Sequence, residues 1–178
     1  MKLFLVACLL CLFGVSALAQ SGAVIVNVNG ITCVTGVGQT GFNALSYSLG
    51  GTVKTGQPGS GREAKVPSLQ DLMVSKNFDA CSERLIRLFL GSTVVPVVTL
   101  IQYSPAGGSE RPYAALTITL TNALMNSYEV TGAPQVHPTE TLDFTYSKVC
   151  VSSITQAEDG RLLPPVTVCY DVAGNKLS

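Results

Sequence analysis

The sequence predicts a mainly β fold, a barrel-like domain of two antiparallel sheets with one short α-helix packed outside. Three observations lead to this prediction. The composition is rich in Val, Thr, Leu, Ser and Gly, with 12% charged residues and no Trp. Short segments of alternating apolar and polar residues recur between turns that contain Gly, Pro or Asn. Apolar residues at helical spacing mark one further segment, residues 80–90.

The first nineteen residues have the layout of a secretory signal peptide. Lys2 supplies the positive charge, residues 3–15 are apolar, and the Ala-Leu-Ala of residues 17–19 forms a small-residue cleavage site. A membrane anchor is disfavoured because a spanning helix needs about 20 apolar residues. A lipoprotein signal at Cys8 is rejected because almost no apolar segment precedes it.

The expected mature chain is a single domain of residues 20–178, since domains commonly hold about 100–200 residues. Without residues 1–19 it has ten basic and eleven acidic residues, a net charge of −1. Nucleic acids and anionic membranes attract basic proteins, so neither is an expected partner. We expect an exported protein, periplasmic or extracellular, whose mature chain does not insert into a membrane.

Seven extended segments are expected, at residues 23–31, 44–49, 66–76, 94–103, 113–130, 141–154 and 165–172. Pro96 is expected to interrupt the fourth, because proline cannot donate a ladder hydrogen bond. Residues 50–64 are rich in Gly, Ser and Pro and are expected to form a long loop.

The longest segment, residues 113–130, shows the clearest alternation. Leu116, Ile118 and Leu120 fall on one face, and the threonines between and after them fall on the other. Asn122 and Asn126 indicate a break or bulge further along the strand.

One helix is expected at residues 80–90. Asp79 can cap its first turn, and Gly91 marks its end. The predicted buried stripe consists of Leu85, Ile86, Phe89 and Leu90.

Four cysteines remain after the signal peptide: Cys33, Cys81, Cys150 and Cys169. An even number in an exported chain favours disulfides over four free thiols. Zinc is disfavoured because no C-x-x-C pair occurs, and His137 is the only histidine. No metal site is therefore expected.

The pairing of two cysteines follows from strand register. Asp159-Gly160 is a strong hairpin signal between the last two extended segments. A turn there places Cys150 opposite Cys169, Val149 opposite Tyr170, Val151 opposite Val168 and Lys148 opposite Asp171. A two-residue loop would put the cysteines on a hydrogen-bonded pair, where side chains stand further apart, and Pro165 in the ladder. We therefore expect a wider loop or a bulge, with Cys150–Cys169 and, by elimination, Cys33–Cys81 as the disulfides.

No motif indicates catalysis. His137 lies between Val136 and Pro138, and no G-x-S-x-G elbow occurs. The glycines of residues 50–61 lack the order of a phosphate-binding loop. The sequence gives no sign that the carboxylates Asp71, Asp79, Glu140 and Asp143 are paired. We expect neither an enzyme nor a bound cofactor.

Several landmarks occur together in a recognisable order. They are Ser46-Tyr47 before Gly50, the Gly-Gln-Pro-Gly-Ser-Gly loop, Val66, Asp71-Leu72, Lys76, Asp79, Ser82 and Leu85. In this order the chain resembles the haemolysin-coregulated protein (Hcp) family, which builds the inner tube of type VI secretion systems. The resemblance covers most of residues 23–172.

The resemblance implies a self-assembling structural protein, a homohexameric ring that can stack into a tube. It implies that the loop of residues 50–64 reaches towards the next ring, with Gln57, Pro58, Gly59, Ser60 and Gly61 at the contact between rings. It also admits a secreted cargo protein in the ring lumen as a second partner.

The predicted signal peptide departs from the family pattern, because tube subunits assemble in the cytoplasm without one. Two functions therefore stay open: an exported ring-forming protein, and a secreted monomeric barrel that acts as a binding module or effector without a tube role.

Overall fold

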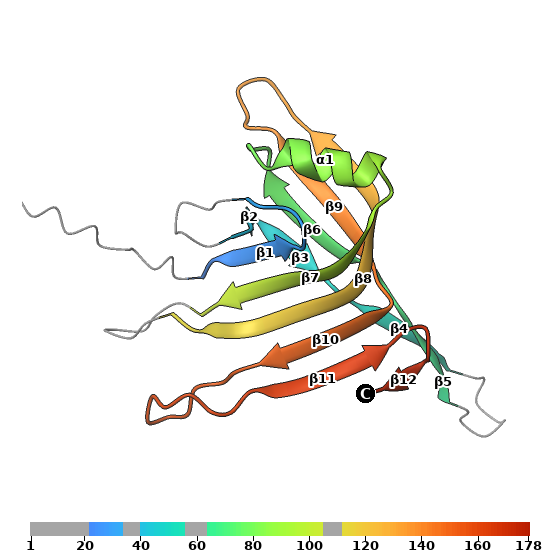
Figure 1. Cartoon of the computed structure of the whole chain (residues 1–178). Coiled ribbons are helices and arrows are strands. Elements are labelled where there is room, and N and C mark those ends of the chain that lie inside the picture. The colour runs from blue at the N-terminus through green and yellow to red at the C-terminus, as the bar shows by residue number, and fades with distance from the viewer. Residues whose placement is uncertain (1–21, 34–39, 56–63, 105–111) are drawn as a thin grey trace, which may run out of the picture.

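A computed structural model describes residues 22–33, 40–55, 64–104 and 112–178 of the chain (Figure 1). Within these ranges it has twelve β-strands and one α-helix, so the predicted mainly β class is confirmed. The elements are β1 (Val24–Val28), β2 (Phe42–Ala44), β3 (Ser46–Ser48), β4 (Gly51–Thr55), β5 (Ala64–Leu69), β6 (Leu72–Asn77), α1 (Ser82–Leu90), β7 (Val94–Tyr103), β8 (Ala114–Thr131), β9 (Thr139–Thr145), β10 (Lys148–Ser153), β11 (Val166–Asp171) and β12 (Lys176–Leu177).

The strands form two antiparallel layers that share β8, rather than a closed barrel. One layer has the order β12-β11-β10-β8-β7-β1-β2, and the other has the order β3-β6-β9-β8. β2 and β3 are separated only by Leu45, so this short segment connects β1 of one layer with β6 of the other. β4 and β5 form a separate two-stranded hairpin that projects from the body at the lower right of Figure 1.

The long strand β8 is irregular at Asn122 and Asn126, the two positions where a break or bulge was predicted. Ile118 and Leu120 face the core before Asn122, whereas Ala123 and Met125 face it afterwards. Asn122 has a φ of 49°, a left-handed conformation that asparagine tolerates better than most residues. At Asn126 the register with β9 shifts by one residue, as in a β-bulge. These irregularities let one strand pair with β10 in its first half and with β9 in its second.

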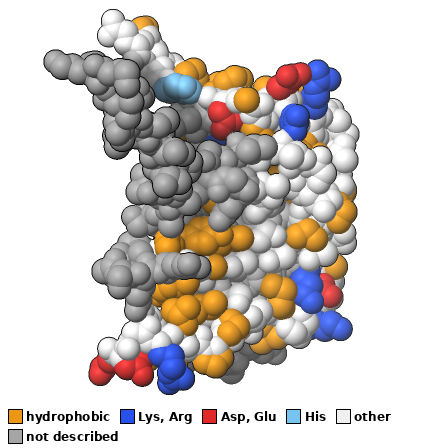
Figure 2. All heavy atoms as spheres, turned by 60° about the vertical axis from the view of Figure 1, so that its left-hand side comes forward, with side chains coloured by type: hydrophobic (Ala, Val, Ile, Leu, Met, Phe, Trp, Pro, Cys, Tyr) orange, Lys and Arg blue, Asp and Glu red, His pale blue; other side chains and the backbone are white. Residues whose placement is uncertain are grey.

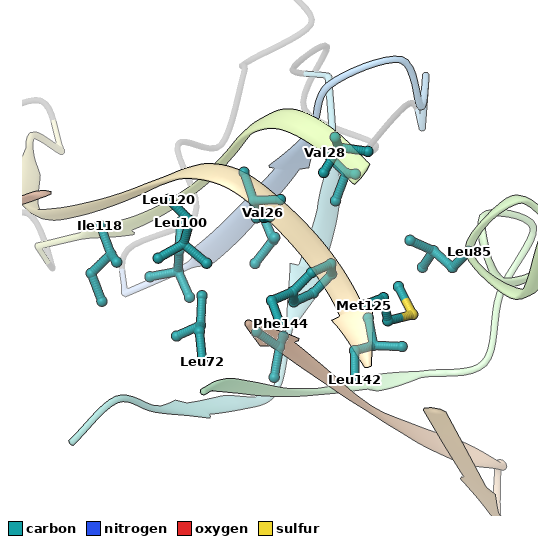
Figure 3. Close-up of a cluster of buried hydrophobic side chains, with 14 of the residues drawn as sticks. Val26, Val28, Leu72, Leu85, Leu100, Ile118, Leu120, Met125, Leu142 and Phe144 are labelled. Atoms are coloured by element: carbon teal, nitrogen blue, oxygen red, sulfur yellow. The ribbon is translucent and has the colours of Figure 1, made fainter. Parts of the chain in front are cut away.

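The core lies between the two layers and under the helix (Figure 3). Leu72, Leu100, Leu120, Leu142 and Phe144 contribute fully buried side chains from both layers. Figure 3 shows Leu85 of α1 pointing from the helix towards Met125 and Leu142. The predicted stripe is wrong at Leu90, which is 73% exposed at the end of the helix.

Four predicted segments differ from the structure in the ways described here. The segments 66–76 and 141–154 each split into two strands at a corner, and Tyr146 at the second corner donates to the Gln70 carbonyl at the first, at 2.9 Å. Residues 51–55 of the expected long loop are strand β4. Pro96 does not interrupt β7, because β1 pairs only with Val98–Gln102 of that strand and Pro96 lies beyond this pairing.

Candidate functional site

The projecting β4–β5 hairpin is the first feature that could serve assembly. Its exposed side chains include Val53 and Val66. At its base the backbone approaches closely, because a Cβ on Gly51 would meet the Ser68 carbonyl oxygen at 3.0 Å. The predicted inter-ring residues Gln57, Pro58, Gly59, Ser60 and Gly61 fall between β4 and β5, outside the described residues.

Behind the helix lies a buried ion pair between Lys76 of β6 and Glu140 of β9, whose side chains are both 0% exposed. The Lys76 Nζ donates to Glu140 Oε1, to Asp79 Oδ1 at 2.9 Å and to Ser82 Oγ at 3.3 Å. The ring of Phe42 lies 5.4 Å from the same nitrogen. A buried charge needs such a set of partners, because leaving it unpaired is costly.

The carboxylate of Glu140 is satisfied from two further sides. Ser82 Oγ donates to Glu140 Oε1 at 2.8 Å, and the Tyr128 hydroxyl donates to Oε2 at 2.5 Å. Burial raises the pKa of Tyr128, and the hydrogen bond and charge of Glu140 raise it further. The network joins β6, β8 and β9 to the first residue of α1, so we interpret it as the anchor of the helix.

Sequence reasoning did not predict this pair, although a signal was present. Lys76 continues the alternation of the buried Leu72 and Val74, and Glu140 begins that of the buried Leu142 and Phe144. A charged residue in phase with core positions on each of two neighbouring strands indicates a buried pair.

The predicted helix cap at Asp79 is wrong. The helix begins at Ser82 with Cys81 at the N-cap position and no side-chain cap. Asp79 instead accepts a hydrogen bond from the Cys81 amide at 2.8 Å and pairs with Lys76. It therefore stabilises the turn before the helix.

Both predicted disulfides are present. Cys33–Cys81 connects the segment after β1 to the start of α1, with Cα atoms 5.5 Å apart, and both cysteines are buried. Cys150–Cys169 connects β10 to β11, with Cα atoms 4.0 Å apart. Both of these cysteines are only partly buried.

The expected irregular hairpin explains how this second disulfide fits. The Gly160 amide donates to the Ala157 carbonyl and Gly160 has a φ of 85°, which gives a three-residue loop with a glycine in the left-handed region. Gln156 pairs with Leu162, one residue out of step with the register that places Cys150 opposite Cys169.

This difference in register requires one additional residue between Leu162 and the start of β11 at Val166. Pro164 and Pro165 lie in this segment, so neither proline enters the ladder. The Val172 amide donates to the Ser147 carbonyl at 2.9 Å, so the cysteines, three residues along each strand, form a non-hydrogen-bonded pair.

Other candidate residues do not form a catalytic site. His137 is exposed in a loop, where its Nδ1 lies 3.2 Å from the Pro138 carbonyl oxygen. Asp71 and Asp143 do interact, since burial and then the Asp71 charge raise the pKa of Asp143. In the described part of the chain, no group of three or more His, Cys, Asp or Glu residues could hold a metal ion.

A pocket of about 350 Å³ lies at the ends of β1 and β7. Its described lining consists of Asn, Thr, Val, Ile and Gly residues and contains no ionisable side chain. Asn27 Oδ1 is buried there without a hydrogen-bond partner. This lining offers polar contacts but no acid, base or nucleophile beyond threonine hydroxyls.

None of the described helices is long and apolar enough to span a membrane. No curated protein sequence matches the chain at a significant level. Solved structures do match its fold. A type six secretion system protein has a TM-score of 0.79 at 18% identity, with 89% of this chain and 100% of that chain covered.

Two further structures show the same fold. Hcp1 from Salmonella typhimurium has a TM-score of 0.69 at 18% identity and covers 89% of this chain and 100% of its own. A type VI secretion system effector from Yersinia pestis has a TM-score of 0.63 at 16% identity, with 84% and 99% covered. At the sequence level, the family model described as type VI secretion system effector, Hcp, matches residues 38–152, more than half of the chain. The chain therefore belongs to the Hcp family of type VI secretion system effectors.

Proposed function

We propose that this Hcp-family protein is an exported structural subunit that assembles with copies of itself into a homohexameric ring able to stack into a tube. Family membership is the observation that carries the proposal. The projecting β4–β5 hairpin supplies one surface that an assembly would cover. Among the described residues, Val166–Val168 of β11 pair with β10 alone, so the outer edge of this stretch is a second such surface. We assign the chain no catalytic role, and a secreted cargo protein in the lumen is a further proposed partner.

The test is the mass of the exported protein. Native mass spectrometry is expected to show six times the subunit mass, and electron microscopy is expected to show rings. A protein that stays monomeric at high concentration would instead support the secreted binding module.

Export is proposed to follow cleavage after residue 19, which leaves one domain of residues 20–178 in the periplasm or outside the cell. N-terminal sequencing of the exported protein is expected to begin at Gln20, within a residue. An intact Met1 on the exported protein would contradict this proposal and place assembly in the cytoplasm.

A further inference from the structure

The pocket at the ends of β1 and β7 is polar but uncharged. Its volume of about 350 Å³ falls at the lower end of the range for small-molecule sites, ~300–1,000 Å³. The polar side chains of its described lining are amides and hydroxyls, from Asn27, Asn29, Thr32, Thr40 and Thr99. Val28, Ile31 and Val97 supply the apolar part. A ligand that carries hydroxyl groups on a small apolar frame matches such a lining.

The sequence around the pocket carries no charge either. Most of the described lining comes from residues 27–40, and residues 20–53 contain no Lys, Arg, His, Asp or Glu. Arg84 of α1 donates to the backbone carbonyl of Thr32, but Arg84 is not part of the described lining. A charged ligand would lose hydration in this pocket without gaining an opposite charge. The pocket therefore favours a neutral ligand over phosphates, carboxylates and metal ions.

The side chain of Asn27 is not satisfied by the fold. Its Oδ1 atom is buried without a hydrogen-bond partner, and a Cβ on Gly41 would overlap that atom, so the Gly41 backbone packs against the oxygen of the amide. The amide makes no hydrogen bond with the described residues, which leaves the two donors of Nδ2 for a ligand. For the fold alone a valine would suit this strand position better, because β-branched residues favour strands.

The outer face of the larger layer continues the chemical character of the pocket. Asn27 lies opposite Thr99 of β7, and Thr99 lies opposite Thr119 of β8. Thr117 and Thr121 share the face of Thr119, because side chains two residues apart on a strand point the same way. These three β8 threonines are half-buried, and together with Thr99 we call them the threonine face. Strands ~4.8 Å apart place Thr119 about 10 Å from Asn27, so a ligand in the pocket can extend over this face.

The described charges of this sheet face lie beyond β8. Ser152 and Thr167 continue the hydroxyls on β10 and β11, whereas Lys148, Asp171 and Lys176 bring charges at the other end of these strands. In the view of Figure 2, charged side chains gather towards the top and the bottom of the molecule, and the described surface at the level of β7 and β8 carries none. A neutral chain can therefore lie over β7 and β8 without meeting a charge.

A sugar chain fits this surface better than a peptide. Extended peptides commonly bind to the backbone of an open strand edge, whereas β7 and β8 are each paired on both sides here. Threonine hydroxyls both donate and accept hydrogen bonds, as sugar hydroxyls do, and threonine methyl groups can pack against the C–H groups of a sugar ring. We propose that the pocket and the threonine face form a binding site for a neutral glycan, with one sugar held by Asn27 and Thr99 and the next sugars over Thr119.

Calorimetric titration of the oxidised protein tests the class of ligand. The neutral probes are chitotetraose, cellotetraose and maltotetraose, and tetragalacturonate is a charged probe of the same length. At least one neutral probe is expected to bind, more tightly than tetragalacturonate. Absence of binding by all three at millimolar concentrations, or binding of tetragalacturonate that is equally tight or tighter, would overturn the proposal. Equally tight binding of a capped tetraserine peptide would assign the surface to peptides instead.

Two substitutions test the position of the site, each removing one polar group. Thr99→Val and Asn27→Val are each expected to weaken binding of the best neutral probe about threefold to tenfold, the effect of one lost hydrogen bond. Thr131→Val is the matched control, because Thr131 is exposed at the far end of β8, and it is expected to bind like the wild type. Circular dichroism checks that each variant is folded. Unchanged binding by either pocket variant would overturn the assignment.

The stability of Asn27→Val separates a ligand-binding role from a structural one. Because the described residues give Oδ1 no partner, loss of the amide is expected to leave the melting temperature without sugar at or above that of the wild type. A lower melting temperature would show that Asn27 serves the fold and would overturn its role in binding. A ring that binds none of the sugars would overturn this inference alone, whereas a monomer that binds one would overturn only the proposed ring.

Discussion

At the scale of single residues, the Lys76–Glu140 pair is the most demanding feature of the molecule. Both side chains are fully buried, and the pair is completed by Ser82 and Tyr128. Such a pair adds little net stability compared with apolar residues of similar size, but it becomes costly when one member is removed.

Lys76→Met is therefore expected to lower the free energy of unfolding by about 3–5 kcal/mol, because Glu140 keeps a buried charge without its cation. The double variant Lys76→Met/Glu140→Leu is expected to recover a large part of this loss. Urea denaturation of the oxidised protein measures both.

The exposed pair between Glu83 and Arg87, 2.7 Å apart on α1, provides the control. Arg87→Met is expected to leave the free energy of unfolding close to that of the wild type, because solvent screens exposed helical ion pairs. Equal losses for the buried and the exposed pair would contradict the anchor role of Lys76.

The effect of the Asp71 charge on Asp143 gives a prediction with a defined pH dependence. Burial and the Asp71 charge raise the pKa of Asp143 in the folded chain, so ionising Asp143 lowers stability as the pH rises through its folded-state pKa. Asp143→Asn is expected to raise the melting temperature near neutral pH, and this gain is expected to vanish below the ordinary aspartate pKa.

Glu83→Gln is the control, because the effect of Glu83 on stability is expected to change with pH in the opposite direction. Its hydrogen bond with Arg87 lowers the Glu83 pKa, so the stability that Glu83 contributes is present near neutral pH and is lost as the pH falls. A destabilised Asp143→Asn at neutral pH would show that the carboxylate makes a favourable contact in the folded protein.

At the scale of elements, the two disulfides are expected to differ in effect. Cys33–Cys81 closes a long separation of 48 residues, for which chain entropy gives about 4 kcal/mol. Cys150–Cys169 spans 19 residues between strands that already pair, so its contribution is expected to be smaller. Unfolding of the two double-alanine variants measures the difference, and a larger loss for Cys150→Ala/Cys169→Ala would contradict it.

Local signals predicted several elements well. β7 has the predicted bounds, and Asn122 and Asn126 mark the irregularities of β8 because their sequence positions interrupt a regular alternation. The pairing of Cys150 with Cys169 followed from the Asp159-Gly160 turn, because the two cysteines are only 19 residues apart and the turn lies between them.

Features that depend on distant contacts were not predictable in this way. The segment 141–154 reads as one strand, but Tyr146 turns at a corner where its hydroxyl bonds the Gln70 carbonyl, 76 residues away. Gly51 and Val53 lie in a glycine-rich stretch that resembles a loop, yet they pair with β5 across the undescribed connection. Two partners of Lys76, Phe42 of β2 and Glu140 of β9, are likewise brought near it only by the fold.

At the scale of the whole molecule, the separate β4–β5 hairpin is attached to the body at its base, where the Gln70 amide donates to the Gly50 carbonyl at 2.8 Å. The core strands do not depend on residues at its far end. A change in the connection between β4 and β5 should therefore leave the fold of the subunit intact.

Deletion of residues 57–61 is expected to shorten stacks of rings while leaving single rings intact, because the hairpin is proposed to reach the next ring and to contribute less to closing each ring. Electron microscopy measures stack length, and native mass spectrometry measures ring size. Replacing the same five residues with a Gly-Ser segment of equal length separates the loss of length from the loss of specific contacts. Stacks of normal length in the deletion variant would show that other surfaces join the rings, and loss of the rings themselves would show that the hairpin contacts the neighbouring subunit within one ring.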